Sequence, residues 1–404
     1  MATLGERIRT LRKQKKLTLE ALAGKELTKG MLSLIENNKA NPSMESLNYI
    51  AKQLDVEVSE LLEEVNVQEL RQVLEQAEKL YYAESEDLDA DLIALVKPYV
   101  DKLSYGYEAA RLLDLYSRSL YYEKKPDWQS YSVRAEKMYD EMNLVEKQAN
   151  IGIFRATVKF VEHDYERALE ILLMERKKIE TKYAFLPAIT RLDFDYNEAV
   201  FYFAIGNTDN AIEVMQRAID FSKEQRMFYR TDALYRLAVG HGMMSFDKQQ
   251  AEYYAKKLLQ FGEFAEDIEA TLFHGFTTAY FFNYDQEYIK ALNIIDQNLA
   301  IMNKENIHLP FYYVEKGKAL YGLGKLEEAL HSLDKVIVPL HIHHPYDLSF
   351  LYVMDSYKAL CHKRLGNIEK AVHLAKIAVD NIKPLPRTPM QDFIFETYEE
   401  CYNG

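Results

Sequence analysis

Hydrophobic residues recur at helical spacing along nearly the whole chain, and the pattern is sharpest at its start. Leu4, Ile8 and Leu11 repeat at intervals of four and three residues, which places them on one face of an α-helix. Thr3 and Glu6 have the spacing of a capping box, so this first helix should begin directly after Thr3. Four more short helices are expected in residues 3–62, because Ser and Thr side chains bind the free N–H groups at helix starts. Their expected caps or first residues are Thr18, Thr28, Ser43 and Ser59.

Beyond residue 120 the helical pattern becomes periodic. Pairs of small residues stand twelve positions apart, and successive second members lie 43, 40, 40, 38 and 42 residues apart. Such a repeat predicts antiparallel helix pairs that cross closely at the small residues. Several units carry a Gly before the second helix, which suits the left-handed turn that ends a helix. The pairs are Ala156/Ala168, Ala199/Ala211, Val239/Ala251, Ala279/Ala291, Gly317/Ala329 and Ala359/Ala371.

The chain between these two regions is also helical in pattern but matches no repeat clearly. We therefore predict three parts: residues 1–65 as a helix-turn-helix domain, 66–120 as a helical connector and 121–404 as the repeats. Within the connector, the acidic stretch Glu84–Asp91 is expected to be a loop, and an incomplete early repeat is expected around Trp128–Met142.

Composition supports an all-α, cytoplasmic protein. Only 15 Gly and 10 Pro occur in 404 residues, which disfavours a turn-rich β fold. The two cysteines, Cys361 and Cys401, have no metal-like spacing and indicate a reducing compartment. No apolar stretch approaches the roughly 18 residues that a membrane span needs, and the charged N-terminus is unlike a signal peptide.

Charge is divided unevenly along the chain. Residues 1–54 hold ten Lys and Arg against five Asp and Glu, a net charge of +5, whereas the remainder holds 40 against 58, a net charge of −18. These sums account for the total of −13. Because DNA attracts cations and repels anions, any nucleic-acid contact should belong to the N-terminal region.

The N-terminal motifs resemble the Cro/repressor-type DNA-binding domain. The resemblance is carried by Leu17–Ala23, with its Leu-Ala pair, and by Leu32–Ser43, with Ile-Glu-Asn followed by Pro-Ser. It implies that helix Thr28–Asn37 enters the major groove of DNA. Leu34 stands where the family often has a polar residue, so it could contact a thymine methyl but could not form a bidentate bond to a base. The implied DNA contacts are Thr18, Leu19, Thr28, Lys29, Gly30, Ser33, Leu34, Asn38 and Lys39.

The periodic region resembles the tetratricopeptide repeat, although its period exceeds the usual ~34 residues and so predicts longer helices or loops. The resemblance implies a right-handed superhelix of helix pairs whose first helices line a concave groove. Apolar, amide and charged groups at the groove positions would suit a short extended peptide, while packing between helices is the alternative for the aromatic residues. The candidate groove residues are Asp193, Tyr196, Asn197, Phe203, Arg236, Tyr280, Asn283, Lys318 and Tyr321.

The combination of a repressor-like domain with such repeats resembles the RNPP-type regulators of Gram-positive bacteria. That resemblance implies a homodimeric regulator, active in quorum sensing, that binds an operator in double-stranded DNA and a re-imported signalling peptide. Tyr196-Asn197-Glu198-Ala199 lies where those receptors commonly carry an Asn that binds the peptide backbone. Two alternatives stay open: a regulator whose repeats bind another protein, and a dimeric repressor that needs no ligand.

Enzymatic chemistry is not expected. The sequence lacks a phosphate-binding Gly loop, a nucleophile elbow and an HExxH motif. His341, His343 and His344 form its one histidine cluster, which without nearby Cys or paired carboxylates is better explained as a loop between repeats than as a metal site. We therefore predict no catalytic residues, no metal and no cofactor.

Overall fold

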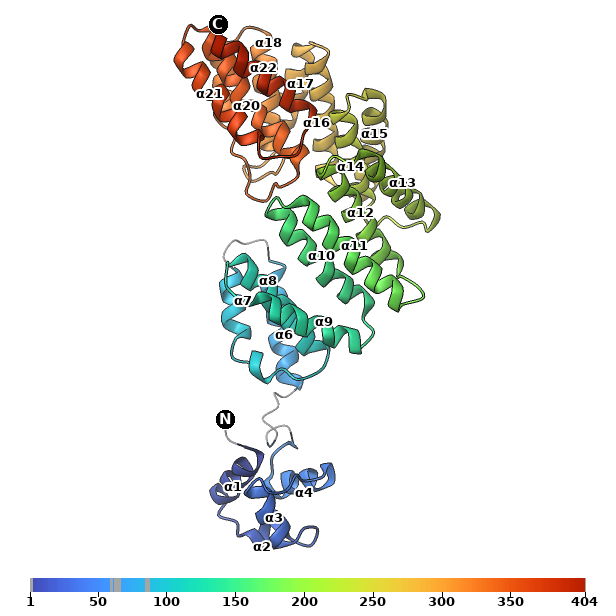
Figure 1. Cartoon of the computed structure of the whole chain (residues 1–404), viewed down its shortest axis with the longest axis vertical. Coiled ribbons are helices and arrows are strands. Elements are labelled where there is room, and N and C mark those ends of the chain that lie inside the picture. Colours follow the sequence, from blue (N-terminus) through green and yellow to red (C-terminus); the bar gives the residue numbers. More distant parts are fainter. Residues whose placement is uncertain (1–2, 59–60, 62–66, 84–87, 404) are drawn as a thin grey trace. The chain divides into compact units, whose positions relative to one another are not determined.

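The computed structural model describes residues 3–58, 61, 67–83 and 88–403, and within these every regular element is a helix (Figure 1). The contacts divide the chain into two compact units, Met1–Ile151 and Gly152–Gly404. None of the described helices is both long enough and apolar enough to cross a lipid bilayer.

The N-terminal helices begin where the sequence predicts. Thr3 and Glu6 form the capping box, with the Glu6 N–H donating to Thr3 Oγ1 at 3.3 Å and the Thr3 N–H donating to Glu6 Oε2 at 2.8 Å. Thr18, Thr28 and Ser43 cap the next three helices through their side chains. The fifth helix, expected to open at Ser59, lies in a stretch largely outside the described residues. The described helices are α1 (Leu4–Gln14), α2 (Leu19–Ala23), α3 (Lys29–Glu36) and α4 (Met44–Leu54).

A single apolar core joins these four helices. Ile8, Leu22, Leu32 and Leu54 are fully buried in it. Helix α1 lies so close to α3 that a Cβ at Gly5 would stand 2.2 Å from the Ile35 carbonyl oxygen. The close approach therefore requires glycine at this position.

A second core follows between residues 67 and 151. Leu92, Leu112 and Tyr139 are fully buried there, on three different helices. Of the expected loop Glu84–Asp91, residues 84–87 lie outside the described residues, and the rest of the prediction is wrong, because α7 begins at Leu88. Carboxylates in the first turn of a helix are stabilised by its dipole, so this acidic stretch is compatible with a helix start. The elements are α6 (Val67–Tyr81), α7 (Leu88–Val96), the 3-10 helix η1 (Val100–Lys102), α8 (Tyr107–Tyr122) and α9 (Trp128–Glu141).

The predicted helix pairs are present. In Figure 1 the pairs from α12 to α21 follow one another as antiparallel hairpins. The helices are α10 (Val145–Val161), α11 (Tyr165–Lys182), α12 (Ala188–Ala204), α13 (Thr208–Glu224), α14 (Thr231–Met244), α15 (Lys248–Ala265), α16 (Ile268–Tyr284), α17 (Tyr288–Leu299), α18 (Leu309–Gly322), α19 (Leu326–Leu333), α20 (Pro345–Arg364), α21 (Ile368–Ile382) and α22 (Pro389–Asn403).

The small residues lie where the paired helices cross. Every paired Ala, together with Val239, is fully buried. Gly317 of α18 faces Leu333 of α19, and a Cβ at this glycine would stand 2.4 Å from Leu333 Cγ. The spacing of twelve thus marks close helix contacts, as the sequence predicts.

Each pair turns through one residue in the left-handed conformation. Gly206, Gly324 and Gly366 occupy this position with φ between 75° and 82°. In the other three units His163, Phe246 and Gln286 adopt it instead, with φ between 57° and 62°. Glycine is therefore a correct but incomplete signal for the end of the first helix.

Candidate nucleic-acid interface and ligand-binding face

Helix α3 presents an exposed leading turn. Thr28, Lys29 and Gly30 are exposed, Ser33 is half-buried, and Leu34 is 44% exposed. The opposite face of α3 holds Leu32 and Ile35 in the core, so the helix is fixed by its apolar face while these groups face outward. Such an arrangement can present side chains to a DNA groove.

The ammonium group of Lys29 on this surface is available to bind a DNA phosphate. Lys29 Nζ lies 2.6 Å from Glu20 Oε1, but both side chains are more than half exposed. An ion pair this exposed contributes little stability, so Lys29 can exchange its partner at low cost. Thr18 is exposed and Leu19 half-buried at the start of α2, beside this pair.

Asn38 and Lys39 follow α3 and are both exposed. Asn38 adopts a left-handed φ of 57°, donates through Nδ2 to Thr3 Oγ1 at 2.6 Å and accepts the Gly5 N–H at 3.2 Å. Its side chain therefore ties the end of α3 to the start of α1, which gives it a structural role that the sequence does not reveal.

A nearly buried ion pair holds α1 against α3. Arg12 binds Glu36 through two bonds, Nε to Oε1 at 2.6 Å and Nη2 to Oε2 at 2.8 Å, and Glu36 is 2% exposed. Arg12 Nη1 also donates to the Leu17 carbonyl at 2.9 Å. The hydrogen bond with Glu36 raises the pKa of Arg12, so the guanidinium stays charged near neutrality.

In the repeats, the first helices of successive units contact one another along the stack. We call the surface formed by α12, α14, α16, α18 and α20 the first-helix face. All nine groove residues predicted from the sequence belong to these helices, on α12, α14, α16 and α18. Whether any of them contacts a ligand stays a prediction, but their surroundings differ widely.

Asp193 and Asn197 form a connected polar group with the turn that precedes α14. Asp193 is buried, and its Oδ1 accepts the Tyr229 hydroxyl at 2.7 Å and Arg230 Nε at 2.8 Å. Asn197 Nδ2 donates to the Asp193 carbonyl at 2.7 Å, and the Arg230 guanidinium lies 5.0 Å from the Tyr196 ring centre. An amide keeps a second N–H and an oxygen for another partner, so half-buried Asn197 can still bind a peptide backbone.

Arg236 belongs to a second polar group, at the starts of α16 and α18. Its guanidinium makes two long polar contacts, 3.3 Å to the Glu269 carbonyl and 3.5 Å to Asp267 Oδ2, and lies 5.2 Å from the Phe273 ring centre. His308 Nε2 lies 3.2 Å from Glu269 Oε2. Desolvation, reinforced by the charge of Arg236, lowers the pKa of His308 to about 4, so this imidazole is neutral near neutrality.

A third group lies deeper, where α16, α18 and α20 meet. Buried Glu315 accepts Lys318 Nζ at 2.6 Å and Asn283 Nδ2 at 2.8 Å. The Lys318 ammonium lies 5.6 Å from the ring centre of Tyr280 and 5.9 Å from that of Tyr357. Lys318 and the Asn283 amide nitrogen thus share the Glu315 carboxylate inside the protein, whereas Asn283 Oδ1 is buried without a hydrogen-bond partner.

The predicted aromatic residues are mainly packing residues. Phe203 is 1% exposed and stacks on His241, and Tyr280 is 4% exposed and donates its hydroxyl to the Met243 carbonyl at 3.2 Å. Tyr321 is half-buried beneath the Arg364 guanidinium, which lies 4.0 Å from its ring centre. For Phe203 and Tyr280 the geometry favours packing between helices, the alternative that the sequence leaves open.

Asp347 is a residue of this face that the sequence does not single out. It stands in the first turn of α20, and its charge acts on Tyr196 of α12. The side chain is exposed to solvent, yet the protein around it desolvates the carboxylate and raises its pKa to about 6. An acid in the first turn of a helix is common, so no local pattern distinguishes Asp347, and its proximity to α12 is a tertiary property.

The histidine cluster lies in the loop 334–344 between α19 and α20, as predicted. The Tyr165 hydroxyl donates to the His343 carbonyl at 2.8 Å, and His344 Nε2 lies 3.3 Å from the Val200 carbonyl. Within the described part of the chain, no three side chains of His, Cys, Asp or Glu lie close enough together to hold a metal ion. The loop thus connects distant repeats within the second unit.

Comparison with known proteins identifies both kinds of module. Residues 5–67 match the model of a helix-turn-helix domain, and residues 196–225 match that of a tetratricopeptide repeat. The expected fold, a helix-turn-helix domain followed by tetratricopeptide-like helix pairs, is thereby confirmed. Both are binding modules rather than catalytic domains, in agreement with the expectation that the chain is not an enzyme.

One curated relative is the immunity repressor protein of Bacillus phage phi105, 40% identical over 63 residues. The match covers 15% of this chain and 44% of that protein, so the chain spans less than half the length of the relative.

Several solved structures are similar at low sequence identity. The crystal structure of Bacillus thuringiensis PlcR with the peptide PapR7 and DNA matches at 18% identity, over 75% of this chain and 100% of that chain, with a TM-score of 0.32. A tetratricopeptide repeat protein of Parabacteroides merdae matches at 13% identity over 78% and 99%, with a TM-score of 0.44. The competence regulator ComR of Streptococcus vestibularis, with its cognate signalling peptide XIP, matches at 18% identity over 66% and 94%, with a TM-score of 0.30.

Proposed function

We propose that this chain is a transcription regulator that binds operator DNA through residues 3–62 and is controlled by a short peptide on its first-helix face. The observation that carries the proposal is the helix-turn-helix match over residues 5–67. The first 54 residues of the chain carry a net charge of +5, ahead of an acidic remainder. The relative that is 40% identical over 63 residues is described as an immunity repressor. The protein acts in the cytoplasm as a homodimer, because helix-turn-helix proteins bind paired half-sites.

DNA contact is assigned to the exposed edge of α2 and α3. Thr28, Lys29 and Gly30 approach the phosphates and base edges, and Leu34 provides an apolar contact. Selection of bound DNA from random duplexes by the full chain would yield the operator. Lys29→Ala should then weaken binding to all duplexes and reduce the salt dependence of log K by about one charge, whereas a chain that shows no duplex binding at low ionic strength would refute this part.

Peptide contact is assigned to Asn197 with Tyr196 and the loosely held Arg236. Asn197 offers amide groups that pair with a peptide backbone whatever the side chains of the peptide, and the internal hydrogen bonds of Arg236 are long. A peptide that binds one arrangement of the first helices better than another would change the spacing of the two DNA-binding heads by a population shift.

The experiment is a titration of fractionated cytoplasmic peptides, followed by operator affinity and thermal shift. Asn197→Ala should abolish the response while operator binding without peptide is unchanged. Asn298→Ala is the matched control, because Asn298 Nδ2 also donates to the carbonyl four residues earlier, at 2.8 Å, but lies on α17 outside the first-helix face. Equal loss in both variants would contradict the assignment.

A second candidate function is binding of another protein by the repeats. It is favoured by the loop 334–344, where Ile337 is 79% and Leu340 95% exposed. Leu340→Ser should then abolish capture of that partner without changing the peptide response. A peptide response in the absence of any partner supports the first function.

A further inference from the structure

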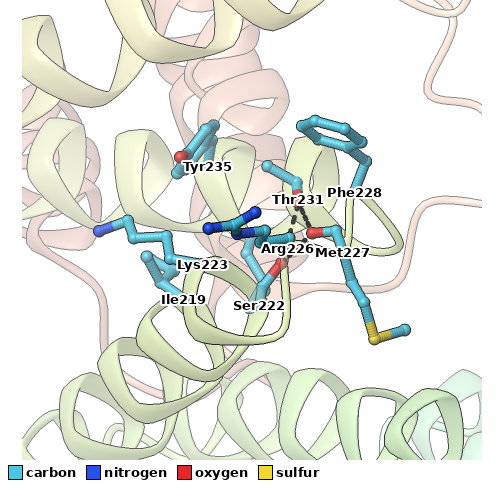
Figure 2. Close-up of a pocket in the computed structure, with 9 residues that line it drawn as sticks. Ile219, Ser222, Lys223, Arg226, Met227, Phe228, Thr231 and Tyr235 are labelled. Carbon is cyan, nitrogen blue, oxygen red and sulfur yellow. Dashed lines mark hydrogen bonds between the residues drawn. The ribbon is translucent and has the colours of Figure 1, made fainter.

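A cavity of about 370 Å³ lies where α13 turns into α14 (Figure 2). Its apolar lining includes Met227, Leu234 and Tyr235, with Phe228 at 61% exposure on its rim. The volume falls within the range of small-molecule sites. None of the predicted groove residues lines it.

Internal hydrogen bonds join the ends of the turn that lines the cavity. The Ser222 hydroxyl donates to the Met227 carbonyl at 2.5 Å and lies 3.2 Å from Thr231 Oγ1. Figure 2 shows these bonds bracing the turn on one side of the cavity. Because both hydroxyls are engaged in the turn, recognition of a ligand depends on apolar contact and on charge.

The charged groups of the lining are all cationic. Lys223 and Arg226 line the cavity, and no acidic residue does. Lys223 makes one long contact, 3.4 Å to the exposed Asp220, and Arg226 forms no ion pair with another described residue. In the view of Figure 2 the Arg226 guanidinium lies among the lining side chains rather than away from them.

Two cations beside an apolar cavity suit a ligand that has an anionic group and an apolar body. An anion here would gain charge-assisted hydrogen bonds from Arg226, and its apolar body would be removed from water against Leu234 and Tyr235. Residues 55–404 carry a net charge of −18, so this local cationic spot contrasts with its surroundings.

We propose that this cavity is a second ligand site, which binds a carboxylate attached to an apolar group. A medium-chain fatty acid and the C-terminal residue of a peptide both have this chemistry. The proposal does not rest on the peptide function assigned to the first-helix face.

Calorimetric titration of the full chain with octanoate tests the site. We expect a dissociation constant on the order of 1 mM or tighter and at least tenfold weaker binding of octanol, which lacks the charge. Arg226→Gln should weaken octanoate binding about tenfold. Arg167→Gln, which removes another exposed arginine on α11, is the matched control and should leave the affinity unchanged.

A second arm separates the two sources of the carboxylate. A short peptide ending in Leu is compared with its C-terminal amide. If the peptide with a free C-terminal carboxylate binds more tightly than octanoate, the site is assigned to a peptide terminus. If octanoate binds more tightly, the site is assigned to a fatty acid. Absence of binding by both acids, or equal affinities in Arg226→Gln and native protein, overturns the proposal. Asn197→Ala should keep octanoate binding, so failure of the peptide function would leave this result intact.

Discussion

At the residue scale, the chain uses ionised pairs to fix positions that apolar packing alone leaves free. Arg12 and Glu36 join α1 to α3 at the edge of the small N-terminal core. Removing one partner of such a pair leaves the other buried without compensation, which costs far more than the net value of the pair.

Arg12→Met should therefore destabilise the N-terminal domain by about 3 kcal/mol. The loss of stability can be measured by hydrogen exchange in the full chain, where the amides of α1 and α3 should exchange roughly 100-fold faster. Arg9→Met is the control, because Arg9 is 44% exposed and lies 3.6 Å from Glu36, and it should change exchange by less than about 1 kcal/mol. Similar effects in both variants would show that Arg12 has no special role.

His308 predicts a loss of stability in mild acid. Its folded pKa of about 4 lies below the ordinary 6.5, so the unfolded chain takes up the proton first as the pH falls. The stabilising contribution is complete above pH 6.5 and is lost as the pH falls toward 4, by about 2 kcal/mol between pH 7 and 5. Denaturant titrations at both pH values should show a smaller drop for His308→Gln, whereas exposed His373→Gln should follow the native chain.

At the element scale, small residues decide how closely the paired helices approach. Their spacing is visible in the sequence, and for that reason the repeats could be located without a structure. The hydrogen-bond partners of the polar residues on the first-helix face could not be predicted from this spacing. Asp193 is fixed by Tyr229 and Arg230, from a turn in which Arg230 has a left-handed φ of 62°.

The same limit applies to Asp347 and Phe203. Asp347 approaches Tyr196 only because α20 folds back toward α12, and this depends on contacts far apart in sequence. Phe203 has the spacing of a groove residue but packs against His241. Periodicity predicts which helix carries a residue, whereas the neighbouring helices decide whether that residue faces a ligand or the core.

Substitution of two glycines should separate packing from helix propensity. Gly317→Ala places a Cβ against Leu333 and should destabilise the second unit by about 1–3 kcal/mol. Gly240→Ala, in α14 with open space around it, should be neutral or stabilising by up to about 1 kcal/mol. Denaturant unfolding measures both, and Leu333→Ala should remove the penalty of Gly317→Ala in the double variant. Equal effects of the two glycine substitutions would exclude the packing explanation.

At the scale of the whole molecule, charge divides along the same line as the proposed functions. The first 54 residues are basic and the remainder is acidic, so the repeats should not compete with the N-terminal domain for the proposed contact with DNA. The proposed dimer then presents two basic domains to one duplex.

An operator selected by the full chain should contain two half-sites about one helical turn apart, or a multiple of it, on the order of 34 Å. Insertion of half a turn between them places the half-sites on opposite faces of the duplex and should weaken binding at least about tenfold. Fluorescence anisotropy with spacing variants measures this, and sedimentation gives the number of chains bound. Affinity that is indifferent to spacing would argue for independent monomers.

The four-residue turn Met227–Arg230 contacts both the proposed cavity site and the polar group around Asp193. Met227 and Phe228 line the cavity, whereas the next two residues of the same short turn, Tyr229 and Arg230, bind Asp193. Two ligands that each favour one conformation of this turn are linked thermodynamically, and such linkage is reciprocal. If a carboxylate at the cavity strengthens peptide binding by some factor, the peptide must strengthen carboxylate binding by that same factor, so either molecule can report on the other.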